Sequence, residues 1–276
     1  MAEEMKEVAV LMSVYRSDRL AYVKLAVDSI LQQTLQDVEL FIGVDGPVND
    51  ELHGYLESHA RNEKVTVKWY EENRGLACVL NDLIEECSKE KYEYYARMDA
   101  DDIALPNRLE KQLAFLKENE DVDVVGGAIE EIDETGGRLG KTVRYPLNNE
   151  GCRRYFRYHD PVAHPAVMFR PRFFEKVKSG YRNAYRRNQD TMLWFDGFKN
   201  GCVFANLPDT VLQYRVTESY YKDRLGDWTL AKRKLKDRMM INHELHYELS
   251  ANLFAVALFC MTAFPAKLKR FLHKRR

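Results

Sequence analysis

Apolar residues in the first 120 positions of the chain form short blocks, and the spacing within the blocks switches between two kinds. Apolar, β-branched runs or strict alternation predict strands, at residues 8–14, 38–44, 65–69 and 92–98. Apolar residues three and four positions apart predict helices, at residues 20–34, 51–59, 76–87 and, opened by a proline at its first turn, 106–117. Strands and helices that alternate over short connections predict βαβ units, and hence an α/β fold with a mostly parallel central sheet and flanking helices.

The order of elements changes after residue 121. Strands are predicted at residues 122–132 and 140–145, a helix at 191–198, a strand, turn and strand within 203–215, and a charged helix at 223–247. We therefore expect one domain over residues 1–220, with halves at 1–120 and 121–220, followed by a helical extension at 221–276.

Composition narrows the class of protein. About 45% of the 276 residues are apolar, which excludes global disorder, and the formal net charge of −1 gives no reason to expect nucleic-acid binding. The five cysteines form no C-x-x-C pair and are odd in number, so we expect free thiols in a reducing compartment. The acidic, polar start lacks the features of a signal peptide, and we expect a cytoplasmic protein.

Polar segments follow three of the predicted strands directly. They are Ser13 to Tyr15, Asp45-Gly46 and Asp99 to Asp102. Ligands of parallel sheets bind at the carboxyl ends of the strands. These segments are therefore the first candidates for a binding site.

Asp99 and Asp101 stand two positions apart after a buried strand, and on an extended backbone they face the same side. Two unpaired carboxylates repel each other, and a hard divalent cation such as Mg²⁺ or Mn²⁺ offsets that repulsion while holding a diphosphate. The alternative is a solvated turn in which Asp102 caps the helix that opens near Pro106.

The segment from Arg97 to Gln112, RMDADDIALPNRLEKQ, closely resembles the D-x-D region of family 2 glycosyltransferases, the inverting enzymes of the GT-A fold. Many of these enzymes build bacterial polysaccharides and lipopolysaccharide. The similarity continues in order over roughly residues 8–216, at the segments 13–15, 26–34, 44–46, 73–77, 80–81, 164–168 and 189–194.

The resemblance implies a GT-A domain over residues 1–220, with a nucleotide-binding first half and an acceptor-binding second half. The donor would be a nucleoside-diphosphate sugar, with a UDP-sugar favoured. Ser13, Tyr15, Asp45 and Arg74 would bind the nucleotide, with Asp45 accepting a hydrogen bond from the uracil ring. Each also has an ordinary alternative, because Asp45 could be a turn residue, Tyr15 a packing residue and Arg74 a surface residue.

The resemblance also assigns roles around the reacting groups. Asp99 would face the ribose or the diphosphate, and Asp101 would ligate Mn²⁺ or Mg²⁺. Asp190, in the pair Gln189-Asp190, would be the catalytic base that deprotonates the acceptor hydroxyl, and an α-linked donor would give a β-linked product. The alternative for Asp190 is a helix N-cap, and both roles can hold together.

The chain departs from the family at one place. Many relatives carry a histidine a few residues after the Tyr-Arg pair, but Tyr214-Arg215 is followed by Val-Thr-Glu. Arg215 could contact the diphosphate, whereas a solvated position is favoured for Lys222. His164 is interpreted as a structural or acceptor-side residue rather than a metal ligand.

The C-terminus is apolar over residues 251–264 and basic over 267–276. Fourteen helical residues reach about 21 Å, short of the roughly 30 Å hydrocarbon core of a bilayer. We expect an amphipathic helix that lies peripherally on the inner membrane leaflet, beside a glycan or lipid-linked acceptor. The alternative is a helix packed on the domain or in a dimer interface.

Two other functions compete with sugar transfer. A nucleotidyltransferase that makes sugar nucleotides normally has a glycine-rich loop after the first strand, and Ser13-Val-Tyr-Arg-Ser17 contains no glycine. An inactive nucleotide-sugar-binding scaffold would not be expected to keep Asp99, Asp101 and Asp190.

Overall fold

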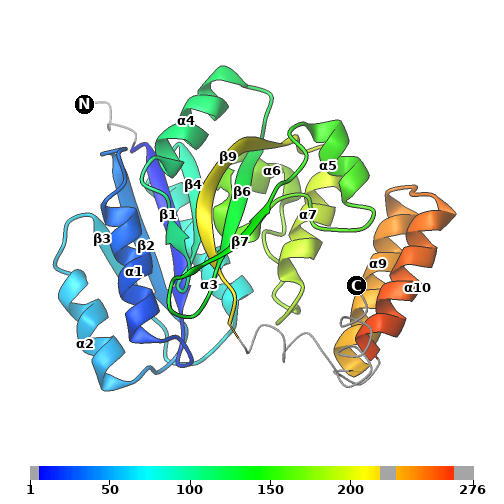
Figure 1. The fold of residues 1–276 in the computed structure, drawn as a ribbon. Coiled ribbons are helices and arrows are strands. Elements are labelled where there is room, and N and C mark those ends of the chain that lie inside the picture. Colours follow the sequence, from blue (N-terminus) through cyan, green and yellow to red (C-terminus); the bar gives the residue numbers. More distant parts are fainter. Residues whose placement is uncertain (1–5, 218–227, 264–276) are drawn as a thin grey trace.

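A mixed β-sheet runs through the part of the chain that the computed structural model describes, residues 6–217 and 228–263 (Figure 1). The strands are β1 (Val8–Val14), β2 (Val38–Val44), β3 (Val65–Trp69), β4 (Tyr94–Asp99), β5 (Ile103–Ala104), β6 (Val124–Ile132), β7 (Arg138–Val143), β8 (Met168–Phe169) and β9 (Phe204–Arg215). The helices are α1 (Leu20–Leu31), α2 (Asp50–His59), α3 (Leu76–Lys89), α4 (Arg108–Glu118), α5 (Asn149–Tyr155), the 3₁₀ turn η1 (His164–Ala166), α6 (Arg172–Val177), α7 (Gln189–Lys199), α9 (Trp228–Glu244) and α10 (Leu249–Ala263).

The sheet has the strand order β3-β2-β1-β4-β8-β6-β9-β5, with β7 paired to β6. The ladders among β1, β2, β3 and β4 are parallel, as is β6 with β9, whereas β8 pairs antiparallel with both β4 and β6. The expected α/β fold with a mostly parallel first half is therefore confirmed. The short strands β5 and β8 and the helices α5 and α6 were not predicted.

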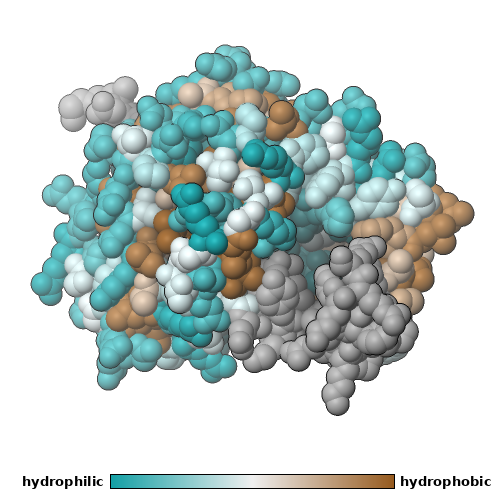
Figure 2. Space-filling model, viewed as in Figure 1, coloured by the Kyte–Doolittle hydropathy of each residue, from teal (hydrophilic) through white to brown (hydrophobic). Residues whose placement is uncertain are grey.

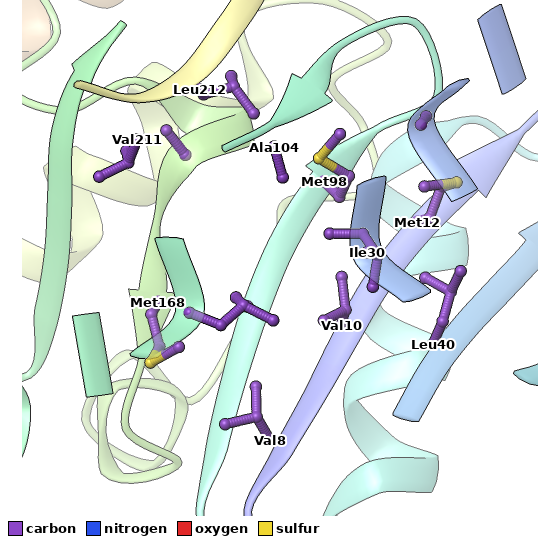
Figure 3. Close-up of a cluster of buried hydrophobic side chains, with 14 of the residues drawn as sticks. Val8, Val10, Met12, Ile30, Leu40, Met98, Ala104, Met168, Val211 and Leu212 are labelled. Carbon is purple, nitrogen blue, oxygen red and sulfur yellow. The ribbon is translucent and has the colours of Figure 1, made fainter. Parts of the chain in front are cut away.

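Two hydrophobic cores cover the two faces of the sheet. Alternate residues of β1, among them Val8, Val10 and Met12, pack toward α1, α2 and α4 (Figure 3). The intervening residues Ala9 and Leu11 pack toward α3, α6 and α7. A strand that is buried on both faces has to be apolar throughout, which explains the continuous apolar run at residues 8–14.

One predicted element is wrong, and several predicted ends are off by two or three residues. Residues 204–215 form one long strand rather than a strand, a turn and a strand. Its register against β6 shifts at Pro208 and Asp209, because Gly127 pairs with Leu207 and Ala128 with Thr210. A proline has no N–H for the ladder, so it occupies a bulge in a continuous strand. Helix α4 begins at Arg108, beyond Pro106, and Asn107 occupies its N-cap position.

Helices α9 and α10 form a hairpin beside the sheet domain (Figure 1). The Arg238 guanidinium donates to the Phe156 carbonyl at 2.6 Å and the Tyr247 hydroxyl to the Arg153 carbonyl at 2.7 Å, which anchors the hairpin to α5 and the residue that follows it. None of the described helices has the length and apolar character needed to cross a bilayer. The basic segment 267–276 and Lys222 lie outside the described residues.

Candidate active site

The strand order reverses between β1 and β4, and a cavity of about 380 Å³ opens beyond their carboxyl ends. Such a reversal leaves a crevice that binds ligands in open α/β sheets. Ser13 pairs in register with Asp99 across the two strands. The cavity is lined by Ser13, Tyr15, Asp18, Asp45, Asn73, Gly75, Leu76, Arg97, Asp99, Ala100, Asp101, Arg186 and Gln189. Five of the seven candidate site residues from the sequence therefore share one cavity.

Asp45 is buried at the end of β2 and organises the loop that follows β3. Its carboxylate accepts hydrogen bonds from the amides of Arg74 at 2.7 Å and Gly75 at 2.9 Å. Gly46 has a φ of 83°, and a Cβ there would lie 2.7 Å from the Asn73 amide nitrogen, so this close approach requires glycine. The Asp45 carboxylate keeps lone pairs for a ligand, because each oxygen accepts more than one hydrogen bond.

Tyr15 lies at the mouth of the cavity with 43% of its surface exposed, so it is not a core residue. Its amide donates to the Asp18 carboxylate at 2.8 Å. Burial, together with the charges of Asp101 and Asp99, raises the pKa of Asp18 to about 7. Asp18 is a site residue that the sequence reasoning missed.

Asp99, Asp101 and Asp102 each bring a carboxylate oxygen within 4.8 Å of the others. Burial, followed by the charge of Asp99, raises the pKa of Asp101 to about 6. The same two causes, burial and neighbouring carboxylates, raise the pKa of Asp102 well above its usual value. The fold therefore concentrates negative charge at the end of β4.

Asp102 is not the helix cap that one interpretation of the sequence assigned to it. Its side chain is 1% exposed and accepts a hydrogen bond from the Arg215 amide at 2.8 Å, which ties the turn after β4 to the end of β9. Its second carboxylate oxygen has no hydrogen-bond partner among the described residues. An unpaired buried carboxylate oxygen beside two more carboxylates fits a hard divalent cation, which takes oxygen ligands.

Two buried arginines, Arg97 and Arg108, lie next to the acidic cluster. Arg97 forms an ion pair with Asp99 and donates to the Leu11 carbonyl at 3.1 Å. Arg108 donates to the Arg97 carbonyl at 2.6 Å. Its complete burial lowers its pKa to about 9. The sequence held one signal for this support, because Arg97 is a charge inside an otherwise buried strand, and unpaired buried charges are costly.

Asp190 lies in the first turn of α7, with Asn188 rather than Asp190 at the N-cap position. One oxygen of the Asp190 carboxylate accepts from the Thr191 amide at 2.8 Å. Burial, followed by the nearby charge of Asp160, raises the pKa of Asp190 to about 6. The preceding residue, Gln189, lines the cavity. A carboxylate with a raised pKa beside a binding cavity suits a general base.

The Arg74 side chain does not line the cavity. It forms an ion pair with Asp82 and stacks 4.3 Å from the centre of the Tyr70 ring, so only its backbone amide contributes, through Asp45. Arg186, which the sequence reasoning missed, does line the cavity, and it donates to the Asn73 side-chain oxygen at 2.7 Å.

Arg215 and His164 have structural contacts. The Arg215 side chain donates to the Asp101 carbonyl at 2.8 Å and to the Asp133 carbonyl at 3.0 Å. His164 is buried, lies 2.8 Å from the Tyr181 hydroxyl, and has its pKa lowered well below the usual value by burial.

Known proteins are similar to this chain in sequence. The family model of glycosyl transferase family 2 matches residues 9–178. The chain is 28% identical to the amylovoran biosynthesis glycosyltransferase AmsE of Erwinia amylovora, over 97% of this chain and 98% of the relative. It is 33% identical to the O-antigen biosynthesis glycosyltransferase WbnJ of Escherichia coli, over 83% and 88%. It is 30% identical to the UDP-Gal:alpha-D-GlcNAc-diphosphoundecaprenol beta-1,3-galactosyltransferase of Escherichia coli, over 82% and 80%.

A solved structure has the same fold. Residues 1–349 of TarS from S. aureus, in complex with UDP, superpose with a TM-score of 0.64 at 16% identity, over 86% of this chain and 65% of that one.

Proposed function

The chain belongs to glycosyl transferase family 2 and has a GT-A-like fold, and we propose that it transfers a hexose from a UDP-sugar to a lipid-linked glycan with inversion at the anomeric carbon. Its relatives act in polysaccharide and O-antigen synthesis. One observation carries the proposal. Asp45, Asp99 and Asp101 line one cavity at the strand reversal, Asp102 is grouped with Asp99 and Asp101, and Asp190 follows Gln189, which lines the same cavity.

We assign residues of the cavity lining to the parts of a nucleoside diphosphate. Tyr15, Asp45 and Asn73 would hold the base, with Asp45 accepting from the uracil ring, and Ser13 and Asp99 would face the ribose and the diphosphate. Arg186 offers the cavity a guanidinium, which binds phosphate through paired hydrogen bonds. The UDP bound to TarS supports the choice of a uridine nucleotide.

Asp101 would hold a divalent cation together with Asp99 and Asp102. Their grouped oxygens and the unpaired oxygen of Asp102 suit Mn²⁺ or Mg²⁺. When bound, the cation neutralises the charge of the departing diphosphate. Arg97 contributes one fixed positive charge to the same group through its ion pair with Asp99.

Asp190 would take the proton of the acceptor hydroxyl. The hydroxyl oxygen forms the new bond to the anomeric carbon on the face opposite the nucleotide, the bond from that carbon to the diphosphate oxygen breaks, and UDP leaves with the electron pair. Attack from the opposite face inverts the configuration. Nuclear magnetic resonance of the product distinguishes inversion from retention.

The rate of transfer is expected to depend on the ionisation of Asp190. Because the base works only when deprotonated and its pKa is raised to about 6, kcat falls about tenfold per pH unit below pH 6 and levels off above pH 7. The measurement is kcat from pH 5 to pH 8 at saturating donor, acceptor and metal, so that the carboxylates of the metal site stay occupied. A rate that is constant across this range would exclude Asp190 as the base.

Donor hydrolysis tests the proposed function directly. UDP-, GDP- and dTDP-sugars are incubated with Mn²⁺ or Mg²⁺, and released nucleotide is measured. We expect slow release from one UDP-sugar, abolished by EDTA. Release of pyrophosphate from UTP and a sugar 1-phosphate would instead indicate the nucleotidyltransferase. UDP binding without turnover, even with lipid-linked acceptors, would indicate the inactive scaffold.

We place the enzyme peripherally on the cytoplasmic leaflet of a membrane. Exposed apolar residues gather on α10, with Leu249 72%, Leu253 65% and Val256 44% exposed, and this edge of the molecule is hydrophobic (Figure 2). An apolar helix face of this kind inserts at the boundary of headgroups and acyl chains. The galactosyltransferase relative acts on a sugar carried by diphosphoundecaprenol, which agrees with a lipid-borne acceptor.

A further inference from the structure

A second cavity, of about 410 Å³, lies between the second half of the sheet domain and the α9–α10 hairpin. It shares no lining residue with the cavity at the strand reversal. Its walls come from the end of β7, the segment after α5, the start of α7, and the facing sides of α9 and α10.

The first turn of α7 separates the two cavities. Gln189 lines the first cavity, whereas Asn188 and Thr191 line the second. Asp190 lies between them in sequence, and two charges of the second cavity, Asp160 and Lys234, act on its carboxylate. Asp190, the proposed base, therefore lies at the boundary between the two cavities.

One group of residues that line the second cavity has the chemistry of a sugar site. Tyr145, Tyr155 and Tyr158 contribute aromatic rings, which cover the apolar faces of sugar rings and offer hydroxyls at their tips. Asp160 contributes a carboxylate, and its two oxygens accept from the Thr191 hydroxyl at 2.9 and 3.0 Å. Carboxylate oxygens have room for further donors such as sugar hydroxyls.

The wall formed by α9 carries Lys234, Arg238 and Asp237, and Arg238 lies 4.0 Å from the Asp160 carboxylate. Lys234 and Arg238 stand four positions apart on α9 and thus on one helix face. Arg238 is fixed there by its bond to the Phe156 carbonyl. Leu258 and Phe259 of α10 also line the cavity, on the helix whose outer face is exposed and apolar.

We propose that the second cavity is the acceptor site and that it takes a glycosyl diphosphate on a hydrocarbon chain. The sugar lies against the tyrosines and Asp160, the diphosphate meets Lys234 and Arg238, and the chain leaves along Leu258 and Phe259. This assignment rests on the proposed function, because it uses Asp190 as the base that receives the acceptor's proton. It explains how a donor and an acceptor reach one carboxylate from opposite sides.

Direct binding tests the assignment without turnover. Decyl diphosphates carrying glucose, galactose or N-acetylglucosamine are titrated by calorimetry into the full chain saturated with UDP and Mg²⁺, below their micelle concentrations. At least one is expected to bind. Lys234→Met should weaken that binding tenfold or more, since it removes a positive charge beside the diphosphate while keeping the length of the side chain. Decyl glycosides of the same sugars, which lack the diphosphate, should bind more weakly than the diphosphates and should respond little to the variant.

The matched control is Lys236→Met, which removes the same charge from an exposed position of the same helix that does not line the cavity. It should leave the binding within about twofold of the unchanged protein. Equal effects of the two variants, or no binding of any decyl diphosphate, would overturn the assignment. If decyl glycosides bind as tightly as the decyl diphosphates, the cavity does not recognise the diphosphate, and the acceptor would be a free glycan. If the unchanged protein does not bind UDP at all, the proposed function itself is refuted.

Discussion

Replacing Asp190 with asparagine is expected to lower kcat for sugar transfer by about a thousandfold, since a positioned general base contributes roughly 10²- to 10⁴-fold. The amide keeps the size of the carboxylate and can still accept from the Thr191 amide, so the first turn of α7 should remain intact. The affinity for the UDP-sugar should stay within about twofold, because Asp190 does not line the donor cavity. Transfer is measured in single turnovers and donor affinity by calorimetry.

The matched control is Asp209→Asn, the same substitution at the bulge of β9, where the carboxylate pairs with Lys111. It should transfer sugar at the normal rate. A similar loss in both variants would indicate a general effect on folding. Normal transfer by the Asp190 variant would remove this residue from the mechanism and direct attention to Asp160, the neighbouring carboxylate.

Replacing Asp101 with alanine is expected to abolish the dependence of donor binding and transfer on a divalent cation. A metal that stabilises a leaving diphosphate contributes several kcal/mol, so transfer should fall at least about a hundredfold. The unchanged enzyme in EDTA should behave like the variant, and the variant should not respond to EDTA at all. The readouts are UDP-sugar affinity and transfer rate across a Mn²⁺ titration.

Thermal unfolding without metal provides the control for this variant. Removing one of three adjacent carboxylates relieves repulsion, so the melting temperature of the variant should equal or exceed that of the unchanged protein. A variant that melts lower and has also lost activity would show damage to the fold. A variant that still requires Mn²⁺ would show that the cation binds elsewhere.

The nucleotide-binding half could be predicted closely because its signals are local. The strands β1, β2 and β4 are largely apolar and each ends in a polar segment, so the hydrophobic pattern alone placed them and the residues at their carboxyl ends. Asp45 and Asp101 are visible for the same reason. Asp18 lies in the turn directly after Tyr15, whereas Arg186 contacts Asn73, 113 positions away, and no spacing rule reports a contact of that kind.

Asp102 and Arg74 have side-chain partners that the sequence pattern did not indicate. Asp102 has a local alternative as a helix cap, but its partner is the Arg215 amide, 113 positions away. Arg74 belongs to a segment that resembles the family, yet its guanidinium donates a hydrogen bond to Asp82 of the following helix, α3. In residues 150–178 the elements are short, and neighbouring parts of the fold define them. Propensity is therefore a weak guide there.

The two cavities are built mostly from different parts of the chain, and this has a consequence for how such enzymes diversify. The cavity at the strand reversal is built mainly from the first hundred residues, whereas much of the second is built from the hairpin after residue 227. Because the two cavities share no lining residue, a substitution in the lining of one changes no lining residue of the other. A lineage can thus keep one sugar nucleotide while its hairpin drifts toward new glycans. Chimaeras joined ahead of α9 would exchange that preference in a single step.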